Sequence, residues 1–279
     1  MPELPEVETI ARTLIGVPDN ASFSIIDREI QDALVLWEGT LANQLPGDFT
    51  VRVKHQSVQS VWRRGKFLVI TLSKDAILIH LRMSGDLRLE RILDEAGTEM
   101  PMQKHDRLVL VFASGIRLVF NNPRKFGRVW LVSDPDEILG DLGPEPLDKA
   151  LDAECFHGML QQHKRQLKPL LMDQHFIAGL GNIYTDEALY RSKLHPIKRS
   201  NMLTKEESAC LLDSIRSVLK EGIRSNGASI DWVYRGGDFQ NHLNVYGRTG
   251  EPCPVCGTQI ERMIVGQRST HICPHCQQL

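Results

Sequence analysis

The chain has 279 residues, of which 42% are hydrophobic and 24% are charged. This composition is ordinary for a globular protein, so it excludes wholesale disorder, a collagen-like chain and a pure coiled coil. The formal net charge of −2 argues against a nonspecific nucleic-acid coat, which is usually strongly basic, although it leaves room for a local basic cleft.

The N-terminal residues predict a helix and no targeting segment. Over residues 5–15, the apolar side chains of Val7, Ile10, Ala11 and Leu14 follow the spacing of one buried helix face. The start of the chain is acidic and lacks the basic and apolar regions of a signal peptide. Because the sequence also has no apolar run long enough for a transmembrane helix, we expect a protein of the cytosol or nucleoid without a membrane partner.

From about residue 22 to residue 132 the sequence changes to short alternating runs that are typical of strands. The clearest runs are residues 62–72, 76–89, 107–113 and 116–120. Ser114 and Gly115 lie between the last two runs and predict a hairpin turn. Several strands with few helices favour a β-sandwich or a barrel-like sheet. Residues 134–149 are rich in acids, glycine and proline, so we expect a linker there.

Helical patterns return from about residue 150 to residue 225. One of these helices begins with Thr204 and Glu207, which have the spacing of a capping box. A glycine-rich turn just before Asn182 predicts another helix N-terminus, where backbone N–H groups favour an anion. Residues 226–242 contain glycines and no clear periodicity, which predicts a mobile loop.

Four of the six cysteines lie near the C-terminus as two C-x-x-C pairs. They are Cys253, Cys256, Cys273 and Cys276. Two such turns can bring four thiolates to one tetrahedral zinc ion, and the residues between the pairs predict two short strands with a turn near Gly266 and Gln267. The pattern therefore predicts a zinc ribbon whose metal is structural, because all four positions are occupied by protein ligands.

Two alternatives to this zinc site remain open on the sequence. A redox dithiol pair is one, although such a pair is more often a single C-x-x-C at a strand–helix turn. Ligation by His271 or His275 is another, although the two C-x-x-C pairs already complete the site. Arg268 follows the expected hairpin turn, where its guanidinium could contact a phosphate, while a lone surface arginine is usually only solvated.

Pro2 becomes a candidate nucleophile if the initiator methionine is removed, which is common before a small residue. An α-amino group has an unperturbed pKa of about 7.7–8.0, so part of it is neutral at physiological pH. Amines form Schiff bases with carbon electrophiles, and Glu3 beside Pro2 could act as an acid or a base. Many chains begin with Met-Pro, so this pattern alone does not establish a catalytic terminus.

Several sequence motifs occur in the order found in one enzyme family. They are MPELPEVETI (1–10), RRGKF (63–67), HLRMSG (80–85), PRKFG (123–127), LGPEPL (142–147), GLGNIY (179–184), NVYGRTGEPC (244–253) and the terminal cysteine pattern. With these motifs the chain resembles formamidopyrimidine-DNA glycosylases, the bacterial base-excision enzymes for oxidised purines. The resemblance runs essentially from end to end.

This resemblance implies an α+β fold. Residues 1–133 would form a β-sandwich domain with a leading helix, residues 134–149 a linker, residues 150–242 a helix–two-turn–helix domain with a flexible lesion loop, and residues 243–279 a zinc finger. DNA would bind in the cleft between the domains. The implied enzyme is a bifunctional glycosylase and abasic-site lyase that removes 8-oxoguanine and formamidopyrimidines and cuts the strand by β,δ-elimination. It would use one structural Zn²⁺ and no organic cofactor, and it would act as a monomer on damaged double-stranded DNA in the bacterial cytosol.

The resemblance also implies catalytic roles for four residues. Pro2 would attack C1′ of the damaged nucleotide, and Glu3 would donate the proton that helps to open the sugar. Lys66 would assist β-elimination, and Arg268 would serve δ-elimination and phosphate contact. Without the family, Lys66 would be interpreted as a strand lysine with its ammonium in solvent. Glu6 could orient Pro2, although an ordinary carboxylate at a helix start is an equally good interpretation.

Contacts with DNA are implied in the same way. An enzyme that acts on a base in a duplex must flip the nucleotide out, so other side chains have to fill the vacated stack. Met83, Arg124 and Phe126 match the family's void-filling residues. On sequence alone, Met83 and Phe126 fit a protein core equally well and Arg124 fits a solvated surface. Phosphate contacts are implied for His105, Arg124, Lys164 and Asn182, and contacts with the damaged base for Lys168 and the loop 226–242.

The sequence departs from the family pattern at a few positions. Arg82 stands where family members often have glycine, and Asn122 stands where aspartate is frequent. The loop 226–242 cannot be assigned from the pattern, so the lesion preference stays open. Cys155 and Cys210 have no role that the family suggests, and we expect them to be buried thiols in helices.

Three other functions are weighed against this one. The sister enzyme endonuclease VIII acts on oxidised pyrimidines with the same amine chemistry, but its start typically differs from PELPEVET. A catalytically inactive DNA-binding relative is disfavoured because Pro2, Glu3 and Lys66 are all present. A redox zinc-ribbon scaffold protein would explain the C-terminal cysteines and nothing else.

Overall fold

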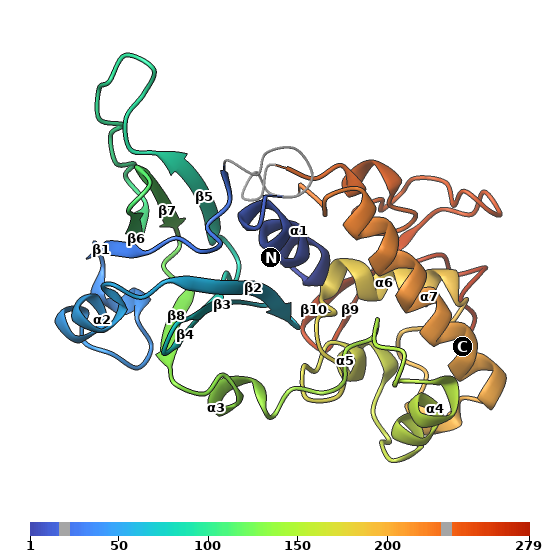
Figure 1. Cartoon of the computed structure of the whole chain (residues 1–279). Coiled ribbons are helices and arrows are strands. Elements are labelled where there is room, and N and C mark those ends of the chain that lie inside the picture. Colours follow the sequence, from blue (N-terminus) through green and yellow to red (C-terminus); the bar gives the residue numbers. More distant parts are fainter. Residues whose placement is uncertain (17–22, 230–235) are drawn as a thin grey trace. The chain divides into compact units, whose positions relative to one another are not determined.

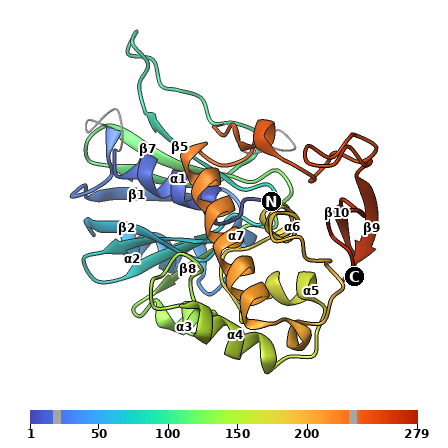
Figure 2. The same cartoon turned by 90° about the vertical axis from the view of Figure 1, so that its right-hand side faces the viewer.

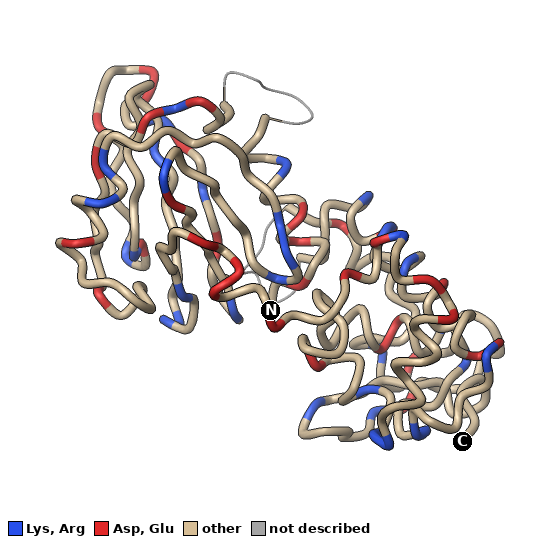
Figure 3. The backbone as a smooth tube through the Cα atoms, turned by 60° about the horizontal axis from the view of Figure 1, so that its bottom comes forward, with Lys and Arg blue, Asp and Glu red and all other residues tan. Residues whose placement is uncertain are grey.

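The computed structural model describes residues 1–16, 23–229 and 236–279 (Figure 1). Helices and strands are both abundant, which confirms the predicted α+β class. None of the described helices is long and apolar enough to cross a membrane. Lysine and arginine residues are interspersed with acidic residues along the chain (Figure 3), in keeping with the small net charge.

The chain divides into two compact units between Gly140 and Asp141. The first unit consists mainly of residues 6–140. The second consists of the described residues that follow, together with the short N-terminal segment Glu3–Pro5. Met1 and Pro2 belong to the first unit by their contacts, whereas the residues that follow them directly in the chain, Glu3–Pro5, make their contacts in the second unit.

Two four-stranded antiparallel sheets form the first unit (Figure 1). One sheet has the strand order β1 (Ile30–Val35), β6 (Asp106–Phe112), β7 (Ile116–Asn121), β5 (Asp86–Arg91). The other has the order β2 (Val58–Arg64), β3 (Phe67–Leu72), β4 (Ala76–His80), β8 (Arg128–Val132). The helices of this unit are α1 (Leu4–Leu14), α2 (Pro46–Val53), the single turn α3 (Asp136–Leu139) and the 3-10 turn η2 (Glu38–Thr40).

The core of the first unit contains side chains of both sheets and one face of α1. Val7, Ile10, Ala11 and Leu14 are all buried in this core, so the predicted helix face is confirmed. Full burial of a large aliphatic side chain stabilises a fold by roughly 1.5–3 kcal/mol. The hydrophobic spacing of α1 therefore fixes which side of the helix faces the sheets.

Strand prediction succeeded for β6 and β7 and was incomplete for the runs 62–72 and 76–89, because each of these contains a turn between two strands. Gly115 has a φ of +73° in the turn between β6 and β7, which confirms the predicted hairpin. Residues 76–89 are two strands in different sheets, β4 and β5, joined by a turn over residues 81–85. Alternation alone does not reveal such a break, because apolar residues continue on both sides of it, fully buried in β4 and partly buried in β5.

The second unit is built from helices that pack on one another (Figure 2). They are α4 (Ala153–Gln161), α5 (Leu167–Leu171), α6 (Asn182–Arg191) and α7 (Lys205–Arg224), with the 3-10 turns η3 (Ser200–Met202) and η4 (Phe239–His242). The side chain of Thr204 caps α7 and Glu207 returns the bond to the Thr204 backbone, so the predicted capping box is confirmed. Tyr184 of α6 stacks on Phe239 with ring centroids 5.1 Å apart.

A two-stranded hairpin completes the second unit. Its strands are β9 (Glu261–Val265) and β10 (Arg268–Ile272), which lie side by side in Figure 2. Arg268 pairs with Val265 in this hairpin. Gly266 and Gln267 form the turn between them with φ values of +55° and +62°. Positive φ at both central residues defines the type I′ turn that suits a two-residue hairpin, and the predicted turn position is confirmed.

Two other expectations concern the second unit. The predicted loop 226–242 includes residues 230–235, which lie outside the described residues. On either side of them, the backbone N–H groups of Asp238 and Phe239 donate to the carbonyls of Ser225 and Gly227. Cys155 in α4 and Cys210 in α7 are exposed, so the expectation of buried thiols is wrong. The two cysteines lie on the outer faces of amphipathic helices, and the apolar spacing did not include them.

Candidate active site

The carboxylate of Glu3 occupies the N-terminus of α6. Its oxygens accept hydrogen bonds from the backbone N–H groups of Gly181 at 2.6 Å, Ile183 at 2.9 Å and Tyr184 at 3.4 Å. Glu3 is 1% exposed. The first N–H groups of a helix have no partner within the helix and carry its positive partial charge, so they stabilise a buried carboxylate. Glu3 is thus held as a preoriented anion.

Two glycines of the GLGNIY motif make this arrangement possible. A Cβ atom at Gly181 would lie 2.4 Å from Cδ of Glu3, and a Cβ at Gly179 would lie 2.6 Å from Cδ1 of Leu4. Gly179 also has a φ of +99°, a region that favours glycine. The backbone N–H of Leu4 donates to the carbonyl of Gly179 at 3.1 Å. The motif is therefore shaped to receive the N-terminal segment of the same chain.

This finding changes the interpretation of Asn182. The glycine-rich turn does lead into a helix N-terminus that holds an anion, as predicted, but the anion is Glu3. The neighbouring backbone N–H groups are consequently occupied, and any phosphate contact of Asn182 must be made by its side chain. Asn182 is partly exposed, and its Oδ1 atom has no hydrogen-bond partner among the described residues.

Pro2 directly precedes Glu3 and is buried, whereas Met1 is 40% exposed. The backbone nitrogen of Pro2 is therefore within one residue of a carboxylate whose position is fixed. Glu6, on the first turn of α1, is also buried, at 2% exposure. Its place in the first turn of α1 agrees with the interpretation as a helix-start carboxylate, and its burial agrees with a role beside Pro2, so both interpretations stay open.

Lys66 lies in the tight turn between β2 and β3. Arg64 pairs with Phe67, so Gly65 and Lys66 form the turn, and Gly65 has a φ of +55°. Lys66 is only 5% exposed, which rules out the alternative of a strand lysine with its ammonium in solvent. The positive charge of Lys66 also contributes to lowering the pKa of His80 on strand β4.

His80 is a residue of this region that the sequence analysis did not single out. Burial, followed by the charges of Arg82 and Lys66, lowers the pKa of His80 from 6.5 to about 3. Its Nδ1 atom accepts a hydrogen bond from the backbone N–H of Arg82 at 3.0 Å. The Phe67 ring packs edge-on against the imidazole with centroids 4.7 Å apart. A neutral His80 therefore helps to shape the turn that begins at Leu81.

The turns over residues 81–85 and 122–127 are tied together by polar contacts. The hydroxyl of Ser84 donates to Oδ1 of Asn122 at 3.2 Å and accepts from the backbone N–H of Arg124 at 3.2 Å. Ser84 and Asn122 are buried at 2% and 0% exposure. By contrast, Met83 is 39% exposed and Phe126 is 52% exposed. Both apolar side chains lie on the surface of linked turns, so the interpretation of these two residues as core is wrong.

A cationic surface accompanies these apolar side chains. The exposed guanidinium of Arg124 lies 5.7 Å from the ring centre of Phe126. Trp37 has two cations over its ring, the ammonium of Lys125 at 5.1 Å and the guanidinium of Arg128 at 5.6 Å. An apolar wedge beside cations is the pattern of side chains that enter and support a DNA stack. Lys125 and Arg128 were not among the predicted contacts.

His105 is connected to the same turn through its backbone. Its carbonyl accepts from the N–H of Asn122 at 2.8 Å, and its Nδ1 lies 3.3 Å from a guanidinium nitrogen of Arg107. Arg107 in turn donates to the carbonyl of Asn122 at 3.2 Å. Lys164, in the second unit just before α5, is exposed as a phosphate-binding lysine requires.

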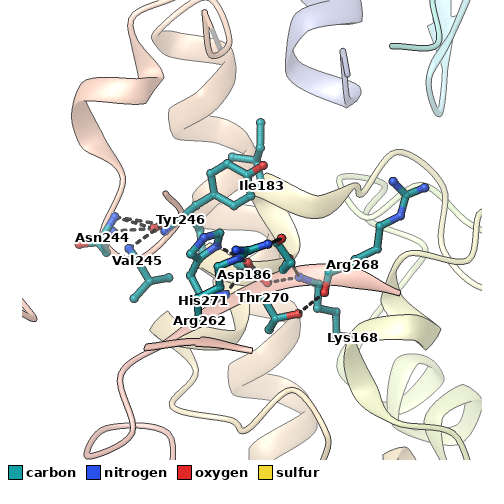
Figure 4. A network of polar contacts seen from close by, with 12 residues as sticks. Lys168, Ile183, Asp186, Asn244, Val245, Tyr246, Arg262, Arg268, Thr270 and His271 are labelled. Carbon is teal, nitrogen blue, oxygen red and sulfur yellow. Dashed lines mark hydrogen bonds and ion pairs between the residues drawn. The ribbon is translucent and has the colours of Figure 1, made fainter. Parts of the chain in front are cut away.

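Lys168 does not lie on the surface. It is 0% exposed, and its ammonium donates to Oδ1 of Asp186 at 2.6 Å and to the carbonyl of Ser269 at 2.8 Å (Figure 4). Burial lowers the pKa of Lys168, against the opposing effects of the Asp186 and Glu3 carboxylates. The expected contact with a damaged base therefore finds no support, because the ammonium is directed into the protein.

The four C-terminal cysteines form one cluster. Their sulfur atoms all lie within 4.8 Å of one another. The sulfur of Cys256 lies 3.4 Å from that of Cys273 and 3.5 Å from that of Cys276, and Cys253 lies 4.0 Å from Cys276. Tetrahedral zinc with bonds of about 2.3 Å separates its sulfur ligands by roughly 3.8 Å, so the cluster fits a structural zinc ion. A hydroxyl–thiol contact of 3.2 Å joins Tyr190 of α6 to Cys253.

Taken together, these features define a class of protein. A β-sandwich unit with an exposed apolar and cationic turn, a helical unit that fixes an N-terminal carboxylate, and a zinc ribbon together are typical of DNA-binding enzymes with an N-terminal nucleophile. Family models agree. Residues 1–129 match the formamidopyrimidine-DNA glycosylase N-terminal domain, residues 142–233 match the formamidopyrimidine-DNA glycosylase H2TH domain, and residues 250–279 match the zinc finger found in FPG and IleRS.

Full-length relatives give the same result. The chain is 43% identical over 286 residues to formamidopyrimidine-DNA glycosylase of Protochlamydia amoebophila, with 99% of each chain covered, and 40% identical to that of Ligilactobacillus salivarius, again with 99% of each covered. A solved structure of MutM with DNA containing carbocyclic 8-oxo-G has a TM-score of 0.89 and 35% identity over 100% of both chains. Lactococcus lactis Fpg with Fapy-dG DNA has a TM-score of 0.88 and 35% identity, over 99% of this chain and 100% of that one. The chain belongs to the formamidopyrimidine-DNA glycosylase family.

Proposed function

We propose that this chain excises oxidised purines from duplex DNA and then cleaves the strand at the abasic site, with the amine of Pro2 as nucleophile. The observation that carries the proposal is the buried carboxylate of Glu3, which follows Pro2 directly and is fixed by three backbone N–H groups. A proton-transfer group held beside an amine is what Schiff-base chemistry at a sugar carbon requires.

The first chemical step follows from this pair. The neutral amine of Pro2 attacks C1′, and the bond from C1′ to the base breaks with its electron pair leaving on the base. Glu3 takes the proton that the amine loses and gives it to the ring oxygen O4′, so the sugar opens and an iminium forms. Because the proline nitrogen is secondary, the iminium stays positively charged without an additional proton. The backbone N–H groups at the start of α6 hold the Glu3 carboxylate in place for this transfer.

Two eliminations then cut the strand. Loss of a proton from C2′ expels the phosphate on C3′, and loss of a proton from C4′ expels the phosphate on C5′. Lys66 assists the first elimination, and its burial in the β2–β3 turn supports a specific role. Arg268, exposed at the first position of β10, binds the second leaving phosphate, because a guanidinium pairs strongly with phosphate oxygens. Water finally releases the sugar fragment and restores the amine.

Contacts with damaged duplex DNA come from both units in this proposal. Met83 and Phe126 enter the space left by the flipped nucleotide, and Arg124 reaches the orphaned base, which their exposure on linked turns supports. Phosphates are bound by the side chains of His105, Lys164 and Asn182. The zinc ribbon contributes Arg268 and needs its metal for folding, since so small a hairpin has little core of its own.

Oxidised purines are favoured over oxidised pyrimidines as substrates. The two relatives named above are formamidopyrimidine-DNA glycosylases, and the two solved structures hold DNA with carbocyclic 8-oxo-G or with Fapy-dG. We further infer that the chain works as a monomer in the bacterial cytosol or nucleoid, where its DNA substrate is located. The hydrodynamic mass of the protein at working concentration tests this inference, and we expect the mass of a single chain.

The decisive experiment is borohydride trapping on a duplex with one 8-oxoguanine, followed by mass spectrometry of the adduct. We expect the DNA to be joined to the nitrogen of Pro2 in a chain that has lost Met1. Pro2→Gly should trap less, and Glu3→Gln should bind the duplex without releasing the base. A fully active chain that retains Met1, or an adduct on a lysine, would refute the proposed nucleophile. A dihydrouracil duplex in parallel should be cut much more slowly.

A further inference from the structure

The second unit contains two buried carboxylates side by side on α6, and neither is explained by the chemistry above. Asp186 and Glu187 are 1% and 0% exposed. Buried acidic side chains are costly unless they are paired or hydrogen-bonded, so each must have a specific set of partners. Apart from Lys168 on α5, their partners all lie in the C-terminal zinc module, which we define as residues 243–279 (Figure 4).

Glu187 holds the segment that leads into the zinc module. Its carboxylate accepts from the backbone N–H groups of Asn244, Val245 and Tyr246 at 2.9–3.0 Å and from the side-chain amide of Asn244 at 2.9 Å. One turn further along α6, Tyr190 contacts the metal ligand Cys253. Helix α6 is therefore the element on which the zinc module is mounted.

Asp186 holds the strand that carries Arg268. Its Oδ2 atom accepts from the backbone N–H of His271 at 2.9 Å and lies 3.2 Å from Nδ1 of the same residue. Its Oδ1 atom accepts a hydrogen bond from the ammonium of Lys168 at 2.6 Å. The same ammonium also donates to the carbonyl of Ser269 at 2.8 Å. One carboxylate therefore fixes two residues of β10, His271 directly and Ser269 through Lys168.

The hairpin tip has a further contact beside this network. A Cβ atom at Gly266 would lie 3.0 Å from Cγ of Pro169, so the turn rests on the residue that follows Lys168. Arg268 itself is exposed, and its guanidinium extends away from the network in Figure 4. Its backbone is consequently held while its charged group remains available to a ligand.

Helix α6 also holds Glu3, the proton-transfer group of the first chemical step. The N-terminus of α6 holds Glu3, and Asp186 lies one helical turn further along. The placement of Glu3, which transfers the proton that opens the sugar, relative to the strand that carries Arg268 is therefore set by α6, through contacts at its first and second turns. An error of about 1 Å in the position of a reacting group can cost roughly 100-fold in rate.

We propose that Asp186, acting through Lys168, is a positioning residue that sets Arg268 for δ-elimination and does not serve base release. This inference rests on the proposed function. In the step concerned, the C4′ proton is lost, the bond between C5′ and its oxygen breaks, and the phosphate leaves with the electron pair. Arg268 neutralises that leaving phosphate only if β10 keeps its place on α6.

The test is the ratio of products on an 8-oxoguanine duplex under single turnover. The 5′-side fragment ends in an unsaturated aldehyde after β-elimination alone and in a 3′-phosphate after β,δ-elimination. For Asp186→Asn, which keeps the shape and removes the charge, we expect the 3′-phosphate fraction per turnover to fall roughly tenfold, with base release changed by less than about threefold. Arg268→Ala should give the same product pattern.

Matched controls separate positioning from general damage. Asp213→Asn makes the same substitution at an exposed position of α7 and should leave both products unchanged. Zinc content and the circular dichroism spectrum must match the wild type. If Asp186→Asn fails to fold, the pair Asp186→Leu with Lys168→Met replaces the buried ion pair by apolar groups of similar size, which is often neutral for stability. That variant should show the same loss of the 3′-phosphate product.

The outcomes distinguish the two proposals. A wild-type chain that neither releases the base nor forms a borohydride adduct would overturn the proposed function itself. A wild-type chain that completes both eliminations, with an Asp186→Asn variant that keeps the wild-type product ratio, would overturn the positioning role alone. A parallel loss of base release and of both eliminations would do so as well, because it would mean that Asp186 only supports the fold.

Discussion

Replacing Gly181 by alanine tests the central geometric claim, that α6 holds Glu3 as the proton-transfer group. The new Cβ would lie 2.4 Å from Cδ and 2.5 Å from Oε1 of Glu3, far inside van der Waals contact. The backbone at Gly181 has a φ of −131°, which alanine adopts without strain, so the effect is confined to the displaced carboxylate. The substitution therefore displaces the Glu3 carboxylate without changing the chemical identity of residue 3.

The magnitude follows from the hydrogen bonds that are lost. The bonds from Gly181 and Ile183, at 2.6 and 2.9 Å, are the two shortest that Glu3 accepts from the α6 N-terminus. A hydrogen bond to a charged group contributes about 1.5–3 kcal/mol, so losing both destabilises this position by roughly 3–6 kcal/mol before relaxation. If half of that cost falls on the transition state, base excision slows by about 10- to 100-fold, at 1.4 kcal/mol per factor of ten.

The assay is single-turnover release of 8-oxoguanine, with strand cleavage at a preformed abasic site measured beside it. An abasic sugar already opens to its aldehyde, so cleavage there depends less on Glu3, and we expect Gly181→Ala to impair it less. Gly158→Ala is the matched control, because a Cβ in that part of α4 meets nothing within 4 Å. That control should gain up to about 1 kcal/mol of stability and keep its activity. Wild-type excision by Gly181→Ala would refute the assigned role of the α6 N-terminus.

Three further predictions address the metal, pH and the departures from the family pattern. Chelation of zinc, or Cys256→Ser, should unfold the ribbon and abolish DNA binding, as shown by lost protection from proteolysis around residue 268. As pH falls from 7 to 5, the first unit should lose about 2 kcal/mol of stability through His80, because its folded pKa of about 3 lies below the unfolded value of about 6.5 and the unfolded chain binds the proton first. Urea unfolding at both pH values measures this loss. Arg82→Gly should raise stability by up to about 1 kcal/mol, since Arg82 has a φ of +54°, yet weaken DNA binding beside Met83 and reduce the salt-dependence slope by about one.

Each of these has its own control. His80→Gln should remove most of the extra pH dependence between pH 5 and 7, and an unchanged dependence would show that other groups cause it. Arg82→Lys should keep the charge and the salt slope, and a slope unchanged in Arg82→Gly would argue that this arginine is only solvated. A ribbon that stays protected after complete removal of zinc would contradict a structural metal.

Local patterns were enough for several parts of this molecule. The buried face of α1, the hairpin of β6 and β7, the cap of α7 and the zinc ribbon all depend on residues close together in sequence. A helix face repeats every three or four residues and a C-x-x-C turn closes on itself, so the physics is contained in short segments. The order of the sequence motifs then indicated the family, and the resemblance to that family supplied the candidate site residues.

The exposure of individual side chains depends on contacts between segments, which the local sequence patterns do not reveal. Met83 and Phe126 fitted a core as well as a surface on sequence, and they lie on the surface because Ser84 and Asn122 tie their turns together. Lys168 was expected to contact the damaged base and is instead buried, because Asp186 and the Ser269 carbonyl satisfy its ammonium. A lysine in a short apolar helix carries no local sign of such a partner.

The sequence by itself determined helix α1, the helical character of the second unit, several strands of the first unit, the metal ligands and an anion-binding helix N-terminus at Asn182. Only the tertiary structure decided which anion fills that site, since Glu3 and Gly181 are 178 residues apart in the chain. It also decided that the neighbouring strands β4 and β5 belong to different sheets and that Asp186 anchors β10. The physical reason is that periodicity and spacing report on interactions within a few residues. A buried charge finds its partner through the packing of the whole unit.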